Sequence, residues 1–233
     1  MDARRLPPAV LAAASDRQGG ALEVAATALG GLLEVADDPD LLVEAVAVLE
    51  SGQPAMAPIW HLALAARSPD PPSALATMRT RLAADADAAV EAATDWLLDR
   101  LAAHLDGGHP GAVATVSHSS LVDRVLGRVD RALGRQGAGS STGPVVGVAG
   151  ADAIGPEGVL NAEGTRELVG RVPTVVVATA VKLVPTEVFG RLGGAGFEVV
   201  RLEALAAVVV GAEVLSPAEA GRRARALTVG PGA

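Results

Sequence analysis

Two runs of β-forming residues in the second half of the chain most constrain its fold. Val145–Ala149 and Thr174–Ala178 are short and almost entirely apolar. Continuous apolar strands are typical of parallel sheets that helices cover on both faces. Between them, residues 165–172 have the length and composition of a short helix. The sequence therefore predicts a βαβ unit, and ligands of such sheets bind beyond the carboxyl ends of the strands.

A charged residue follows each of these predicted strands. Asp152 comes after the first run and Lys182 after the second. Lys182 is the only lysine in the chain, which suggests a position that requires a compact ammonium group and not a guanidinium fork. Codon bias combined with chance explains the same observation equally well.

The first half of the chain has helical spacing. Breaks rich in proline, glycine and aspartate separate five segments in which apolar residues recur every three or four positions: Pro8–Ser15, Gly19–Ala36, Leu41–Leu49, Ala55–Ala66 and Ser73–Leu105. A glycine-rich break follows the last of them. We therefore expect a helical N-terminal domain over residues 1–108 and a second domain over residues 109–233.

Composition argues against several classes of protein. The chain has no cysteine, which excludes a disulfide scaffold, thiolate metal sites and a cysteine nucleophile. Its net charge of −8 argues against general nucleic-acid binding, because the phosphate backbone is bound by basic surfaces. No apolar run reaches the roughly 18–20 residues that span a membrane, and we expect no signal peptide. We expect a cytoplasmic protein without a metal or cofactor.

A second polar strand end lies at the start of the predicted second domain. The strand Ala112–Val116 is followed by Ser117, His118, Ser119 and Ser120, and a helix over 121–133 begins at once. Free N–H groups and the helix dipole favour an anion at such a junction, although Ser119 or Ser120 can equally serve as the helix cap. The glycine-rich residues 134–143 lack the GK[ST] ending of a P-loop and are interpreted as a linker. Two more strands, Phe197–Leu202 and Ala206–Gly211, and a helix capped by Ser216 complete the prediction.

Several of these residues together resemble one family. Residues 150–154 (GADAI), Gly158, Asn161, Gly164-Thr165, Val172-Pro173 and Lys182 are similar to a motif of the initiation factor 2B alpha/beta/delta family, which includes methylthioribose-1-phosphate isomerase and ribose-1,5-bisphosphate isomerase. Residues 53–58, 115–122 and 207–217 resemble further parts of that family. The resemblance implies an α/β protein with a helical N-terminal domain, a Rossmann-like C-terminal sheet and a homodimer formed through the C-terminal domain.

The resemblance also implies a set of site residues. Those expected to contact a ligand are Gln53, Ser117, His118, Ser119, Ser120, Asn161, Gly164, Thr165 and Lys182. If the protein is an enzyme, Asp152 and Ser117 are expected to be the catalytic pair.

Three departures from the family bear on activity. The isomerases carry a cysteine where this chain has Ser117, and a hydroxyl is a far weaker acid than a thiol. Gln53 replaces an arginine, which removes a bidentate phosphate contact. Only about 30 residues separate His118 from Ala149, where relatives place two more strand–helix units. The sheet is therefore expected to be about two strands shorter than theirs.

Three functions follow from this reading. The first is a non-catalytic or regulatory initiation factor 2B-like protein that binds a phosphorylated sugar or nucleotide. The second is an aldose–ketose isomerase acting on a phosphorylated pentose. The third is a structural or interaction protein that retains a remnant site.

Overall fold

The computed structural model describes residues 5–104, 111–116, 119–134 and 143–227. Five helices form its first part: α1 (Pro8–Ser15), α2 (Ala21–Glu34), α3 (Pro39–Gly52), α4 (Ala57–Ala66) and α5 (Pro71–Ala102). The Asp38 and Asp70 carboxylates cap α3 and α5 by accepting hydrogen bonds from Leu41 N and Ser73 N, and proline occupies the first turn of each helix. These caps explain why the proline- and aspartate-rich breaks predicted the helix starts.

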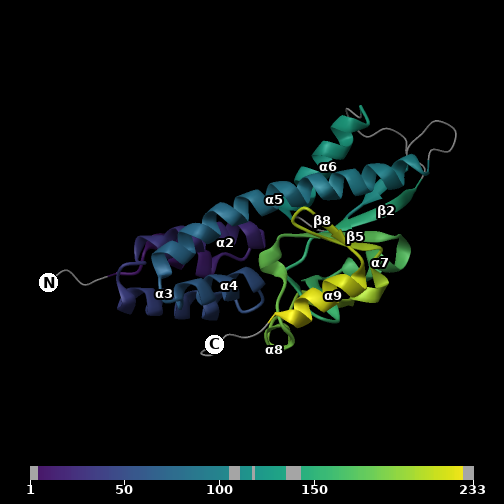
Figure 1. Ribbon diagram of the computed structural model, residues 1–233. Coiled ribbons are helices and arrows are strands. Elements are labelled where there is room, and N and C mark those ends of the chain that lie inside the picture. Colours follow the sequence, from purple (N-terminus) through teal and green to yellow (C-terminus); the bar gives the residue numbers. More distant parts are fainter. Residues whose placement is uncertain (1–4, 105–110, 117–118, 135–142, 228–233) are drawn as a thin grey trace.

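The helices pack around a core of leucine, valine and alanine. Its largest fully buried side chains are those of Leu29, Leu32, Leu49, Leu62 and Leu75. Helix α5 is longer than this bundle and continues over the sheet, so that it spans both ends of the molecule (Figure 1). Its later residues Val90, Leu97 and Leu101 belong to the core beneath it, which the sheet and α6 (Ser120–Ala132) complete.

The main sheet has five strands in the order β1-β2-β5-β7-β8. These strands are β1 (Ala112–Ala114), β2 (Pro144–Ala149), β5 (Thr174–Ala178), β7 (Ala207–Val210) and β8 (Glu213–Leu215). The first four pair in parallel, and β8 pairs antiparallel with β7. With α7 (Thr165–Arg171) between β2 and β5, the predicted βαβ unit and the α/β class are confirmed. Strand β1 lies at the edge of the sheet, where the expected loss of two outer strands would leave it.

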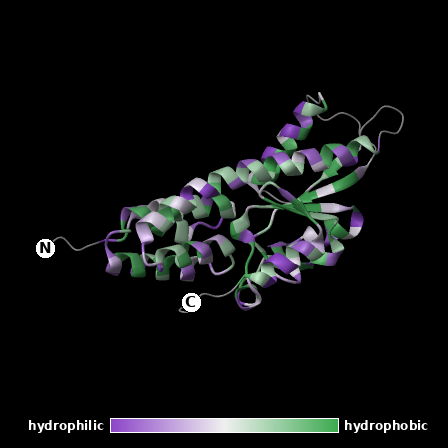
Figure 2. Cartoon of the chain, viewed as in Figure 1, coloured by the Kyte–Doolittle hydropathy of each residue, from purple (hydrophilic) through white to green (hydrophobic). Residues whose placement is uncertain are grey.

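Helices cover both faces of this sheet. Figure 1 shows α5 and α6 on one side and α7 and α9 (Pro217–Ala226) on the other. Alternate residues of a strand therefore enter different cores: Val175 and Val177 face α5, whereas Val176 faces α9. Figure 2 shows the resulting contrast between the mainly hydrophobic strands of the sheet and the helices, in which hydrophobic and hydrophilic residues alternate.

A second, antiparallel sheet was not predicted from the sequence. It consists of β3 (Ala153–Ile154), β4 (Gly158–Ala162) and β6 (Phe197–Arg201), in that order. The residues before α7 were predicted to form a turn, because β3 is only two residues long and β4 begins with glycine. Strand β6, which was predicted as a strand, pairs with β4 and so lies outside the parallel sheet.

Short elements complete the fold: η1 (Ala180–Lys182), α8 (Thr186–Phe189) and η2 (Leu202–Ala204). The predicted cap of the last helix is confirmed, since Ser216 Oγ accepts a hydrogen bond from Glu219 N. Among the described helices, none is both long and apolar enough to cross a membrane.

Candidate functional site

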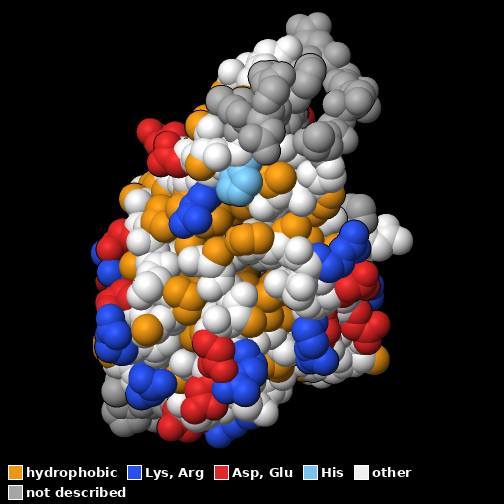
Figure 3. Space-filling model, turned by 90° about the vertical axis from the view of Figure 1, so that its right-hand side faces the viewer, with side chains coloured by type: hydrophobic (Ala, Val, Ile, Leu, Met, Phe, Trp, Pro, Cys, Tyr) orange, Lys and Arg blue, Asp and Glu red, His pale blue; other side chains and the backbone are white. Residues whose placement is uncertain are grey.

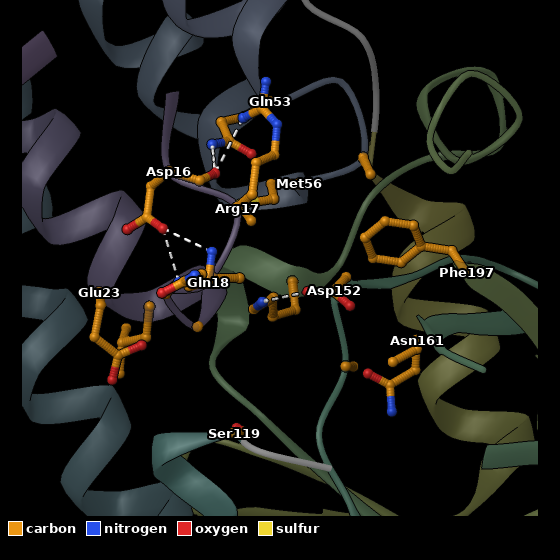
Figure 4. A pocket seen from close by; sticks show the side chains of 18 of the residues that line it. Asp16, Arg17, Gln18, Glu23, Gln53, Met56, Ser119, Asp152, Asn161 and Phe197 are labelled. Atoms are coloured by element: carbon orange, nitrogen blue, oxygen red, sulfur yellow. Dashed lines mark hydrogen bonds and ion pairs between the residues drawn. The ribbon is translucent and has the colours of Figure 1, made fainter. Parts of the chain in front are cut away.

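A cavity of about 630 Å³ lies between the helical bundle and the carboxyl ends of the strands. Volumes of this size are typical of small-molecule sites. Its walls come from the α1–α2 connection, the first turns of α2 and α6, the segment before α4, the ends of β2, β4 and β5, and the loop before β6. Figure 4 shows Asp16, Gln18 and Glu23 on one side, with Asp152, Asn161 and Phe197 opposite.

Lys182 and Asp152 form the charged centre of this cavity. Lys182 ends η1 just after β5, and Asp152 follows β2, so adjacent parallel strands deliver the two residues to one edge. Lys182 Nζ lies 3.9 Å from Asp152 Oδ1, and Lys182 is only 4% exposed. Burial lowers the pKa of Lys182 to about 8, against the opposing attraction of Asp152 and then Glu23. Burial likewise raises the pKa of Asp152, which Lys182 opposes.

Backbone hydrogen bonds hold Asp152 in place. Its N–H donates to Leu160 O at 2.9 Å, and its carbonyl accepts from Ala57 N at 3.2 Å. The first contact anchors Asp152 to β4, and the second ties it to the start of α4. The carboxylate therefore sits at a fixed point where the helical bundle meets the sheet.

The predicted residues around α7 divide into two groups. Asn161 lines the cavity from β4 and is buried. Thr165 lies behind it: Asn161 Nδ2 donates to Thr165 Oγ1 at 2.9 Å, and this hydroxyl donates to Ala162 O at 2.8 Å. Gly164 supplies the left-handed turn before the helix, with φ of 96°. Gly164 and Thr165 therefore shape the turn that positions Asn161, and they are not part of the cavity wall.

Gln53 lines the cavity, but its amide nitrogen is engaged elsewhere. Gln53 Nε2 donates to Ala13 O at 2.7 Å and to Asp16 O at 2.6 Å. These carbonyls belong to the end of α1, where helical carbonyls lack partners within the helix. The side chain thus joins the end of α1 to the α3–α4 connection, and a dashed line in Figure 4 marks its hydrogen bond to Asp16.

Two helices begin at the cavity wall. Ser119 and Ser120 line it at the start of α6, a helix of 13 residues, and Gly20 and Ala21 line it at the start of α2, a helix of 14 residues. Neither helix has a side-chain cap in its first turn. N–H groups and helix dipoles at such ends favour anions. The other two residues of the predicted turn, Ser117 and His118, lie outside the described residues.

On the helical side of the cavity, Gln53 was predicted, but the residues of the α1–α2 connection were not. Arg17 lines it and donates from Nη1 to Ala14 O at 2.9 Å and Asp16 O at 3.0 Å. The Asp16 carboxylate accepts hydrogen bonds from Gly19 N and Gln18 N, which lower its pKa. The sequence feature that could have indicated these residues is the polar, glycine-containing break between α1 and α2, which was interpreted only as a helix boundary. Within the described parts of the chain, no three histidine, aspartate or glutamate side chains cluster as a metal site would require.

Comparison with known proteins identifies the fold. No family model matches the sequence, and no curated protein sequence matches it. Translation initiation factor eIF-2B from Pyrococcus horikoshii OT3 matches with a TM-score of 0.66 and 16% identity, over 91% of this chain and 98% of that one. The 5-methylthioribose 1-phosphate isomerase from P. horikoshii OT3 matches with a TM-score of 0.59 and 14% identity, over 92% and 85% of the two chains.

A subunit of the tetrameric eIF2B-beta2-delta2 complex from Chaetomium thermophilum is a third match. Its TM-score is 0.55 at 12% identity, over 77% of this chain and 78% of that one. The likeness is therefore one of structure, over most of each chain, at very low sequence identity. This protein has the fold of the initiation factor 2B and 5-methylthioribose 1-phosphate isomerase structures, carried by a sequence far diverged from theirs.

Proposed function

We propose that this protein is a non-catalytic, initiation factor 2B-like member of that family that binds a small phosphorylated ligand, a sugar phosphate or a nucleotide, in the cavity. The observation that carries the proposal is the buried Lys182 ammonium in a cavity that also receives two helix N-termini. Burial of a cation is costly unless an anion compensates it, and the Asp152 carboxylate, at 3.9 Å, lies beyond hydrogen-bond distance. A phosphate group bound at these helix starts would add negative charge near the ammonium group and accept hydrogen bonds from the backbone N–H groups there.

The cavity wall is less suited to catalysis than to binding. Aldose–ketose isomerisation needs a second proton-transfer group besides Asp152, and a serine hydroxyl is a weak one. Asp16 is a poor proton donor, because its carboxylate accepts two backbone hydrogen bonds that lower its pKa. The raised pKa of Asp152 favours the isomerase as second candidate, since a poised carboxyl can move a proton. The third candidate is an interaction protein that retains only a remnant of the site.

The test is a thermal-shift measurement against ribose phosphates and nucleotides, with wild type beside Lys182→Met. Specific binding at a hundredfold excess over Kd stabilises the native state by about 2.7 kcal/mol. We expect a shift in wild type that Lys182→Met loses. Arg67→Met is the matched control: it also removes one positive charge, from an exposed pair with Glu50, and should keep the shift. No shift with any compound would overturn the proposal in favour of the remnant site, and turnover of a phosphorylated pentose would favour the isomerase.

We also propose that two copies associate through the C-terminal part of the chain. Figure 3 shows hydrophobic side chains across the sheet end of the molecule, with charged side chains around them. Oligomers occur among proteins of this fold, as in the tetrameric eIF2B-beta2-delta2 complex. Sedimentation equilibrium should give twice the monomer mass, and a monomer at all accessible concentrations would contradict the proposal.

A further inference from the structure

Lys182 carries the only side-chain amine of this protein, and the fold holds it inside the cavity. The other residues of the lysine and arginine total are all arginine, and their guanidinium groups stay protonated. Lys182 is 4% exposed, and it lines the cavity beside Asp152. An amine that is taken out of water and placed next to a carboxyl group has the surroundings of lysines that attack carbonyl carbons.

The neutral form of the amine is accessible here. Burial lowers the pKa of Lys182 to about 8, so roughly a tenth of the side chain is unprotonated at pH 7. A lysine at the ordinary value of 10.5 would be neutral in only about one molecule in 3,000. Nucleophilic attack requires the neutral amine, and the cavity therefore raises its concentration about 300-fold.

We propose that Lys182 forms a reversible imine with the open-chain aldehyde of a phosphorylated aldose bound in the cavity. This inference rests on the proposed function, because the phosphate group provides the affinity that brings the aldehyde to the amine. It narrows the ligand class to phosphorylated compounds with a free or ring-opening aldehyde.

The chemistry balances with the groups present. The Lys182 nitrogen attacks the carbonyl carbon, so that a C–N bond forms as the carbonyl π bond breaks, and one of the two amine protons passes to the carbonyl oxygen to give a carbinolamine. The Asp152 carboxyl then donates a proton to the departing hydroxyl, water leaves, and the nitrogen gives up its remaining proton, which returns to the Asp152 carboxylate. One aldehyde and one amine thus yield one imine and one water, without an oxidant or reductant. The raised pKa of Asp152 suits this proton donor role.

The test is reductive trapping of the imine in the full-length protein. Wild type is incubated at pH 7 with glyceraldehyde 3-phosphate and cyanoborohydride, which reduces an imine to a stable secondary amine. Cleavage after arginine places Lys182 in the peptide Val172–Arg191, which contains no other amine side chain. This peptide should gain the mass of the aldehyde less one oxygen atom.

Four comparisons make the result specific. Trapping with glyceraldehyde, which lacks the phosphate, should be at least about tenfold slower, and glycerol 3-phosphate, which lacks the aldehyde, should suppress trapping. Lys182→Arg keeps the charge but cannot form the imine, so its peptide should stay unmodified. Asp152→Asn should slow trapping by about tenfold or more, since it removes the proton donor.

Each outcome decides between the two proposals. If the peptide stays unmodified, or if both aldehydes modify it at the same rate, the imine is overturned. A thermal shift with glycerol 3-phosphate or another phosphorylated compound would then show that the proposed phosphate site still stands, and no shift with any of them would remove both proposals. Should Lys182→Arg fail to fold, the two aldehydes on wild type still give the answer.

Discussion

The layer between α5 and the sheet and the wall of the cavity are both buried, but they are built from opposite kinds of side chain. In the layer, Leu97, Leu101 and Val175 are fully buried and belong to one cluster of apolar side chains. In the cavity wall, Lys182, Asn161 and Gln53 are 4–6% exposed. Burial of apolar area stabilises the fold, whereas burial of an ammonium group opposes it. The comparison indicates that the layer maintains the fold, while the buried Lys182 ammonium group in the cavity wall lowers its stability.

The largest expected effect comes from truncating the layer. Leu97→Ala should lower the free energy of unfolding by about 2–5 kcal/mol, because it leaves a void in a close-packed core. Urea unfolding measures this, and Val43→Ala is the control, since Val43 is 70% exposed and should change stability by less than about 0.5 kcal/mol. The Leu97→Ala protein that remains folded should bind ligand as wild type does. A binding defect without loss of stability would contradict the division between a stabilising layer and a ligand-binding cavity.

Because Lys182 is buried in the cavity wall, the free energy of unfolding should depend on pH. The folded pKa of Lys182, about 8, lies below its ordinary value of 10.5, so between these values the unfolded state binds more protons. Stability should therefore rise with pH across this window, by about 3 kcal/mol in total. The chain has no tyrosine or cysteine and no other lysine, so no other side chain titrates ordinarily in this window. Lys182→Met should abolish the rise, and an equal rise in that variant would contradict the account.

Gln53 tests whether a buried polar residue of the wall is also structural. Gln53→Ala removes the donor for Ala13 O and Asp16 O, which should cost about 1–3 kcal/mol. Gln53→Met is the matched variant that keeps most of the volume but not the hydrogen bonds. Equal losses in both would attribute the effect to hydrogen bonding, while full stability in both would show that water replaces the amide.

Asp152→Asn should have the smallest effect on folding. The substitution removes an anion whose pKa burial already raises, and Lys182 can release its proton, so we expect a change of about 1 kcal/mol. Near-ultraviolet circular dichroism should be that of wild type. Of the two carboxylates that raise the pKa of Lys182, Asp152 has the larger effect. Without it, the rise of stability with pH should begin below pH 8. Unfolding of this variant would mean that Asp152 is a structural residue and not part of a ligand site.

Local patterns predicted the layer better than the cavity. Helical spacing and the Asp38 and Asp70 caps marked α3 and α5, and the valine runs marked β2 and β5. Strands β3 and β4 were not predicted, because β3 has only two residues and β4 begins with glycine, which weakens its strand pattern. Lys182 and Asp152 were found because strand ends are where parallel sheets bind ligands.

The helical wall of the cavity could not be found in the same way. Gln53 contacts carbonyls 37 and 40 positions away, and nothing in the sequence near Gln53 indicates that pairing. Arg17 enters the cavity because the bundle packs against the sheet ends, which is a tertiary property. The ligand contacts predicted for Ser117 and His118 stay predictions.

The most direct test of the account is an NMR titration of Lys182, whose side chain gives the only lysine ¹³Cε signal of the protein. The chemical shift is followed with pH, first without ligand and then with saturating glycerol 3-phosphate, which carries a phosphate group but no aldehyde that could react with the amine. The account predicts a pKa of about 8 in the free protein and a higher pKa in the complex, because a bound phosphate favours the charged amine. An ordinary pKa that the ligand does not change would contradict it.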